Sequence, residues 1–182
     1  MSRSGGELAQ IAAHVGVGGE EYDERKLDAA FTALDELNVF AKQRGVEILL
    51  ENIPNKLSSA ERLVHFLEMT HLDLGFCFDT GHANIMEGVE QAFQIMRSRI
   101  RSTHIHDNDS VNDIHYFPYL KSGGTIDWRK TMNLLRPYSD QYPLLLELKE
   151  DPDMGPPLEA VQEIFRRMEA EPAPADDEPG RR

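Results

Sequence analysis

The sequence is poor in cysteine and has no long apolar run, and each shortage excludes a class of protein. Its single cysteine, Cys77, cannot form a disulfide framework or a multi-cysteine zinc motif, so a reducing compartment is expected. No apolar stretch approaches the roughly 20 residues that cross a bilayer. Residues 1–19 also lack the basic start and apolar run of a secretory signal. We therefore expect a cytoplasmic protein without a membrane partner.

Basic residues are scarce as well. The chain has 19 Lys and Arg against 32 Asp and Glu, which gives a formal net charge of −13. Lys and Arg supply most of the non-specific affinity for nucleic acid, so this balance argues against a nucleic-acid partner unless the fold forms a local basic groove. The length of 182 residues and the hydrophobic content of 40% fit one globular domain.

Short apolar segments alternate along the chain with amphipathic ones. Apolar residues in the amphipathic segments recur at three- and four-residue steps, which is typical of one face of a helix. The strands expected between them are Leu8–Val15, Val46–Leu50, Leu72–Phe78, Ser102–His106 and Leu144–Leu148. Strict alternation predicts parallel strands with helical crossovers, which is α/β architecture with about five strand–helix units. Residues 1–170 are expected to form this domain, and the proline-rich, acidic residues 171–182 a disordered tail.

Local signals predict several helix boundaries. Ser58 and Glu61 match a capping box at the start of one helix, and Asp127 is a plausible N-cap of another. The apolar stripe that begins at Val89 is expected to continue to Ile100 within a helix. The run Asp79–His82 (DTGH) is interpreted as a turn that lets both side chains face one site.

Each expected strand ends near a carboxylate or an imidazole. The carboxyl ends of parallel strands meet at one edge of an α/β fold, where active sites form. The residues at these ends are His14, Glu51, Asp79 with His82, His104 with His106, and Glu147. Any one carboxylate could be a structural group bonded to backbone amides. Several that converge would repel each other strongly without a cation, so the set predicts a metal site.

Two Glu, one Asp and one imidazole make an oxygen-rich set that suits one divalent ion, Mn²⁺, Mg²⁺, Co²⁺ or Zn²⁺. The predicted ligands are Glu51, Asp79, His104 and Glu147. His106 shares a face with His104 and is expected to hydrogen bond to a ligand residue or to substrate. Asp113 and His115 follow in a loop, where they contact substrate or are simply solvated. Cys77 is expected in the core.

The ordered runs LLEN, FDTGHAN, THIHDN, DIH with GGTIDW, and LLELK resemble the xylose-isomerase-like TIM-barrel superfamily. Its members include sugar-phosphate isomerases and epimerases and the endonuclease IV-type abasic-site nucleases. The resemblance extends from about Ile11 to Lys149. In the isomerases it implies one metal on Glu51, Asp79, His104 and Glu147, with substrate contacts at His82 and His115.

The superfamily barrel has eight strands, and this chain resembles strands four to eight, so an incomplete TIM-type barrel is expected. An open edge would expose backbone groups, which predicts a homo-oligomer or a complementing chain. The leading functional hypothesis is a metal-dependent isomerase or epimerase of a sugar or sugar phosphate, acting through an enediolate. Glu51 and Glu147 would be its acid–base pair, and the substrate contacts would be His14, His82, His106, Asp113 and His115.

Two alternatives stay open at this point. In the nucleases, a similar pattern that includes His14 and Asp113 holds clustered zinc, so an abasic-site nuclease is the second hypothesis. The third is a truncated barrel that keeps the site residues and is catalytically inactive.

Overall fold

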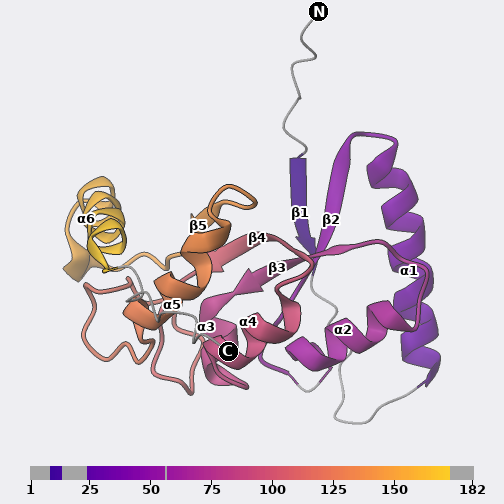
Figure 1. The fold of residues 1–182 in the computed structure, drawn as a ribbon, viewed down its shortest axis with the longest axis horizontal. Helices are drawn as coiled ribbons and strands as arrows, with labels where there is room; N and C mark the ends of the chain where they lie inside the picture. Colours follow the sequence, from indigo (N-terminus) through magenta and orange to yellow (C-terminus); the bar gives the residue numbers. More distant parts are fainter. Residues whose placement is uncertain (1–8, 14–23, 56, 173–182) are drawn as a thin grey trace, which may run out of the picture.

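The structure is a computed structural model that describes residues 9–13, 24–55 and 57–172 (Figure 1). Strands and helices alternate along the described chain, as the sequence predicts. The strands are β1 Ala9–Ala13, β2 Val46–Glu51, β3 Gly75–Asp79, β4 Ile100–Ile105 and β5 Leu144–Leu146. The α-helices are α1 Glu24–Lys42, α2 Ala60–Glu68, α3 Thr80–Ile85, α4 Val89–Met96, α5 Trp128–Leu135 and α6 Pro157–Ala170. Two 3-10 turns, η1 Arg136–Tyr138 and η2 Pro152–Met154, complete the set.

The five strands form one parallel sheet in the order β1-β2-β3-β4-β5. Spatial order equals chain order, and the helices that connect successive strands pack on each other, α2 on α4, α4 on α5 and α5 on α6. This is the winding of a TIM-type barrel, so the expected incomplete α/β barrel is confirmed. Within the described sheet, β1 and β5 are the two edge strands.

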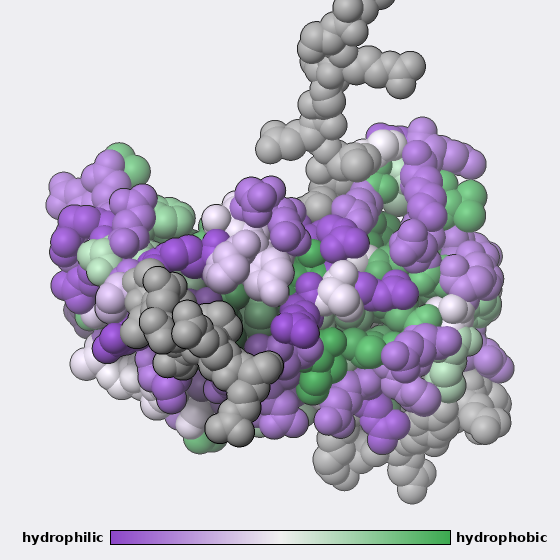
Figure 2. Space-filling view, in the orientation of Figure 1, coloured by the Kyte–Doolittle hydropathy of each residue, from purple (hydrophilic) through white to green (hydrophobic). Residues whose placement is uncertain are grey.

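The core lies between the sheet and these helices. All five residues of β3 are buried, because a parallel strand is covered on both faces. Phe78 of β3 meets Phe93 of α4 edge to face, with ring centroids 5.7 Å apart. Cys77 is buried in the same strand, as expected for a core residue. Figure 2 shows a mainly hydrophilic face, with apolar residues visible toward the side of α1 and α2.

Expected strand bounds differ from the observed ones by up to three residues, as where β3 begins at Gly75 and not at Leu72. Three other local predictions were wrong. Ser59, not Ser58, caps α2 by accepting a hydrogen bond from the Arg62 amide, and Ser58 lies one residue earlier, in a turn where its amide donates to Asn55. Ile100 is the first residue of β4, where it pairs with Phe76.

The third correction concerns the DTGH run, which is the start of α3 and not a simple turn. The Asp79 carboxylate caps this helix by accepting a hydrogen bond of 2.7 Å from the His82 amide. The cap offsets the poor helix propensity of Gly81.

The remaining expectations about boundaries and membranes have different outcomes. In the part of the chain that the structure describes, no helix is both long and apolar enough to cross a bilayer. The proposed tail lies mostly outside the described residues, and the domain boundary at residue 170 stays a prediction. The Arg136 guanidinium donates to the carbonyl of Glu171, so ordered contacts reach at least that residue.

Candidate active site

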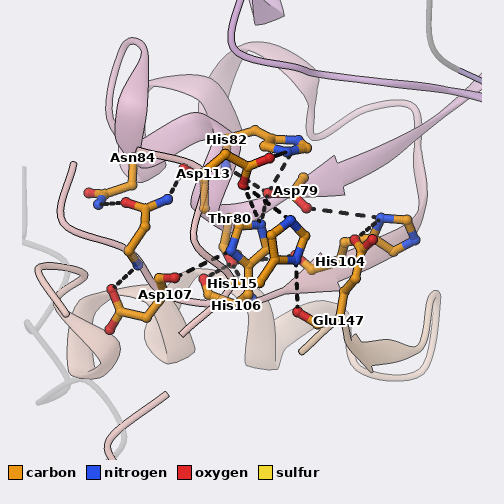
Figure 3. A network of polar contacts seen from close by, with 12 residues as sticks. Asp79, Thr80, His82, Asn84, His104, His106, Asp107, Asp113, His115 and Glu147 are labelled. Atoms are coloured by element: carbon orange, nitrogen blue, oxygen red, sulfur yellow. Dashed lines mark hydrogen bonds and ion pairs between the residues drawn. The ribbon is translucent and has the colours of Figure 1, made fainter. Parts of the chain in front are cut away.

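Four side chains converge at the carboxyl ends of the strands, and Figure 3 labels three of them, Asp79, His104 and Glu147. Glu51 and Asp79 are the last residues of β2 and β3, His104 lies in β4, and Glu147 directly follows β5. His104 Nδ1 lies 3.1 Å from Glu51 Oε1, 2.9 Å from Glu147 Oε2 and 3.9 Å from Asp79 Oδ2. One ligand atom from each of the four residues lies within 4.8 Å of the others. The sequence-predicted ligand set is therefore brought together at one point.

Burial makes this cluster unfavourable without a cation. Glu51 is 1% exposed and Asp79 is fully buried. Asp79 Oδ1 caps α3, but its Oδ2 is buried without a hydrogen-bond partner. Burying a charged carboxylate oxygen without a partner costs on the order of several kcal/mol of lost solvation free energy. Three carboxylates and one imidazole, with an unsatisfied oxygen among them, fit a divalent metal ion.

A second cluster borders the first. His82 of α3, His106 just after β4, and Asp113 and His115 of the following loop bring one ligand atom each within 4.8 Å of the others. Asp113 joins them, with its carboxylate 3.3 Å from His82 Nε2 and 3.1 Å from His115 Nε2. The rings of His106 and His115 stack at 3.8 Å. These are four of the five residues predicted to contact substrate.

His106 connects the two clusters. Its side chain is fully buried, and its Nε2 lies 3.0 Å from Asp79 Oδ1 at an angle that makes no hydrogen bond. A Cβ at position 81 would overlap this ring, so only glycine at this position of α3 leaves room for the His106 side chain. The glycine of the DTGH run is therefore explained by the space that the His106 imidazole needs, and not by the predicted turn.

The acidic surroundings favour the charged form of the histidines. Burial opposes protonation of His82, but Glu51, Asp79 and Asp113 outweigh it and raise its pKa to about 9. The hydrogen bond to Glu51 is the main reason why the pKa of His104 is raised. For His106 burial again opposes protonation, and contact with Asp79 raises the pKa overall. Protons thus occupy a site that a divalent cation would compete for.

Sequence reasoning missed Asn52, which shapes the site. Asn52 exchanges two hydrogen bonds of 2.9 Å with the backbone of Asp79 and accepts a third from His82 Nδ1 at its carbonyl oxygen. It thereby joins the end of β2 to the end of β3 and orients the His82 ring. Its only sequence signal was its place in the run LLEN, directly after Glu51.

Cys77 lies closer to the site than a core prediction implied. Its sulfur is within 4.8 Å of ligand atoms of Glu51 and His104. Burial, together with the nearby carboxylates, raises the pKa of the thiol well above its ordinary range. Of the remaining histidines, His65 and His71 are exposed on the surface, and His14 lies outside the described residues.

Comparison with known proteins assigns the family. A model of the xylose isomerase-like TIM barrel family matches residues 2–171. The match covers most of the chain, so the protein belongs to this family.

Individual relatives are more distant. The inosose dehydratase of Serratia proteamaculans is 25% identical over 144 residues, covering 69% of this chain and 48% of its own length. A D-tagatose 3-epimerase-like protein superposes with a TM-score of 0.69 at 24% identity, covering 88% of this chain and 63% of its own. The 3-keto-D-glucoside 4-epimerase YcjR of E. coli gives a TM-score of 0.67 at 16% identity, covering 88% and 64%. The structural matches establish the fold, and the chain spans about half the length of the curated relatives it matches.

Proposed function

We propose that the protein is a divalent-metal-dependent isomerase or epimerase of a sugar or sugar phosphate. The observation that carries the proposal is the convergence of Glu51, Asp79, His104 and Glu147 around the unsatisfied Asp79 Oδ2. Family membership and the epimerases and dehydratases among the relatives support the same class of chemistry.

The four converging residues would hold one ion, Mn²⁺, Mg²⁺, Co²⁺ or Zn²⁺. When bound, such an ion polarises a carbonyl group and stabilises negative charge on adjacent oxygens. Glu51 and Glu147 would act as the acid–base pair, removing the proton from the hydroxyl-bearing carbon next to the carbonyl group to give an enediolate and returning it. Oxygens of Glu51 and Glu147 lie 3.1 and 2.9 Å from His104 Nδ1, so both carboxylates reach the same point of the site. Two carboxylates at one site would allow removal at one face of a substrate and return at the other.

The second cluster would orient the substrate. Asp113 and His115 project from the loop toward His82 and offer a carboxylate and imidazole nitrogens to sugar hydroxyl groups. His106, with no exposure, would act on the substrate side only through the His115 ring that it stacks on. His14 keeps its predicted role as a substrate contact.

Two measurements on one sample test the proposal. Metal analysis after dialysis should give one tightly bound divalent ion per chain. Incubation with ketoses and ketose phosphates in D2O should incorporate deuterium next to the carbonyl group, detected by NMR, in the metal-loaded protein and not after chelation. Bound metal without exchange for any substrate would favour the inactive barrel instead.

The nuclease remains a second candidate because of one observation. His82, His106, Asp113 and His115 form a ligand cluster next to the first, and such adjacency could hold additional zinc. The charge of −13 opposes it. More than one zinc per chain, together with cleavage of an abasic-site duplex, would favour the nuclease over the isomerase.

We also propose that another copy or a complementing chain covers the sheet edges. In the described sheet β1 and β5 have no strand beyond them, and Leu145 of β5 is 47% exposed. Unpaired edges of this kind favour association. Light scattering on purified protein should give a mass above 20.7 kDa, and an active monomer would contradict the proposal.

A further inference from the structure

The loop that carries Asp113 and His115 is held in an unusual conformation. Ser110, His115 and Tyr119 have φ values of 65°, 57° and 64°, and these are all the non-glycine residues with positive φ in the described chain. Residues other than glycine rarely adopt this region, and they stay there only when their surroundings hold them. Something must therefore fix the segment between β4 and α5.

The Asp107 side chain is the centre of the contacts that fix it. The residue is 4% exposed. Its Oδ1 accepts hydrogen bonds from the amides of Asn108, Thr125 and Ile126 at 2.8, 3.0 and 3.1 Å. Its Oδ2 accepts a bond of 2.7 Å from the indole of Trp128. One carboxylate thus joins the beginning of the loop to its end and to the first residue of α5.

The backbone of Asp107 holds the middle of the loop. It pairs with Tyr116 through two hydrogen bonds, of 3.0 Å from the Asp107 amide and 2.7 Å from the Tyr116 amide. Tyr116 directly follows His115, so this pairing helps to place the His115 ring, together with a bond of 3.1 Å from His115 Nδ1 to the Glu147 carbonyl and one of 3.3 Å from the Lys149 amide to the His115 carbonyl. A Cβ at position 124 would overlap the Asp107 carboxylate, which explains why glycine stands there in the GGTIDW run.

We propose that Asp107 is a positioning residue that holds Asp113 and His115 over the metal-facing side chains. The residue before it, His106, contacts Asp79 and stacks on His115, so a shift of the loop would move the second cluster relative to the first. The functional part of this inference rests on the proposed isomerase activity. The positioning itself can be tested without any substrate.

Three variants test it. Asp107→Asn removes the charge and one acceptor, and Trp128→Phe removes only the indole donor, so the second remains informative if the first fails to fold. Asp127→Asn is the matched control, because it makes the same change beside Trp128 on an exposed carboxylate, and Asn caps a helix as well as Asp.

The first readout is the reaction of His115 with diethyl pyrocarbonate, followed by peptide mass spectrometry. Exposed His65 and His71 serve as internal references for reagent and folding. We expect His115 to react at least tenfold faster relative to these references in Asp107→Asn, less so in Trp128→Phe, and as in the wild type in Asp127→Asn. An unchanged His115 rate in both Asp107→Asn and Trp128→Phe would overturn the proposal.

The second readout separates the two proposals. In Asp107→Asn, kcat/KM should fall by about 10²-fold, as for a misplacement of about 1 Å, while bound metal stays at the wild-type value. A parallel loss of metal would mean that Asp107 supports the whole sheet edge, which would also overturn the proposal. If the wild type exchanges no substrate proton, the proposed function fails, and the His115 reactivity still decides the role of Asp107.

Discussion

The inner and outer halves of the site differ in what holds them. Glu51 and Asp79 end the central strands, are 1% and 0% exposed, and are fixed by the sheet and by Asn52. Glu147 follows the short edge strand β5, and Asp113 lies in the loop after β4. Their side chains are 46% and 40% exposed. A buried, rigid carboxylate suits metal binding, whereas an exposed one can reach substrate and exchange protons. We therefore propose that the inner half mainly retains the metal, with Glu51 as the buried member of the acid–base pair, and that Glu147 of the outer half is its accessible member.

Glu147→Gln gives the largest expected effect, because it removes a proton acceptor from the outer half. The amide keeps one oxygen for the metal but cannot take a proton. Exchange into substrate should fall roughly 10²- to 10⁴-fold, while the metal content stays near the wild-type value. Deuterium incorporation measures the first and metal analysis the second.

Exposed Glu150 is the matched control for this variant, since it lies three residues further along the same segment. Glu150→Gln should leave exchange unchanged. Full activity in Glu147→Gln with metal bound would remove Glu147 from the chemistry and leave the outer half without a base.

Asp79→Asn tests the inner half. The amide oxygen can still cap α3, but a ligand charge is lost at the most buried position. We expect the metal affinity to fall by more than about 100-fold, beyond the 10- to 100-fold that is typical of residues that only orient a ligand. Competition with a metal-sensitive dye measures the affinity. The control is Asp73→Asn, at a 96%-exposed carboxylate before β3, and equal losses in the two variants would refute the assignment.

His82 lies at the boundary between the two halves, and metal binding should release its proton, which is a smaller expected effect. The pKa of His82 is about 9 because Glu51, Asp79 and Asp113 attract its proton against the effect of burial. At pH 8 the metal-free protein therefore carries this proton. A divalent cation beside Glu51 and Asp79 cancels much of that attraction, lowers the pKa of His82 and releases the proton.

A pH indicator in weak buffer should record this release during a metal titration at pH 8. His82→Gln should release correspondingly less, and a release identical to the wild type would show that the protons come from elsewhere. His65→Gln, on the exposed face of α2, provides the control.

The two halves also differ in how far the sequence predicted them. Glu51 and Asp79 directly follow apolar runs, so their place at strand ends could be inferred from periodicity alone. Asp113 and His115 could be proposed from their place in the loop after a strand, but simple solvation stayed open for both, because nothing local says that a loop folds back over a sheet. Asn52 and Asp107 were not predicted. Their importance lies in bonds to backbone groups 27 and 18 to 19 residues away, which only the assembled fold brings near.

The exact helix starts could not be predicted for a similar reason. Ser58 and Ser59 are equally suited to the N-cap position by residue type, and the structure places Ser58 in the turn around Asn55, one residue before the cap. The DTGH run reads as a turn because glycine disfavours a helix, yet the Asp79 cap and the space needed by His106 make it the start of α3. In each case a contact made by a more distant residue overrides the local preference.

Deletion of the C-terminal residues should have the smallest effect, and its size depends on where the cut falls. Residues 173–182 are proline-rich and acidic and offer little to bury, so their removal should leave the melting temperature unchanged. A cut after Ala170 also removes the Glu171 carbonyl that accepts from Arg136 at 2.9 Å. Losing that bond should cost about 0.5–1.5 kcal/mol, or roughly 1–6 °C for a chain of this size. Calorimetry of both truncations against the full chain would detect this difference, and a large loss from the shorter deletion would show that the last ten residues pack on the domain.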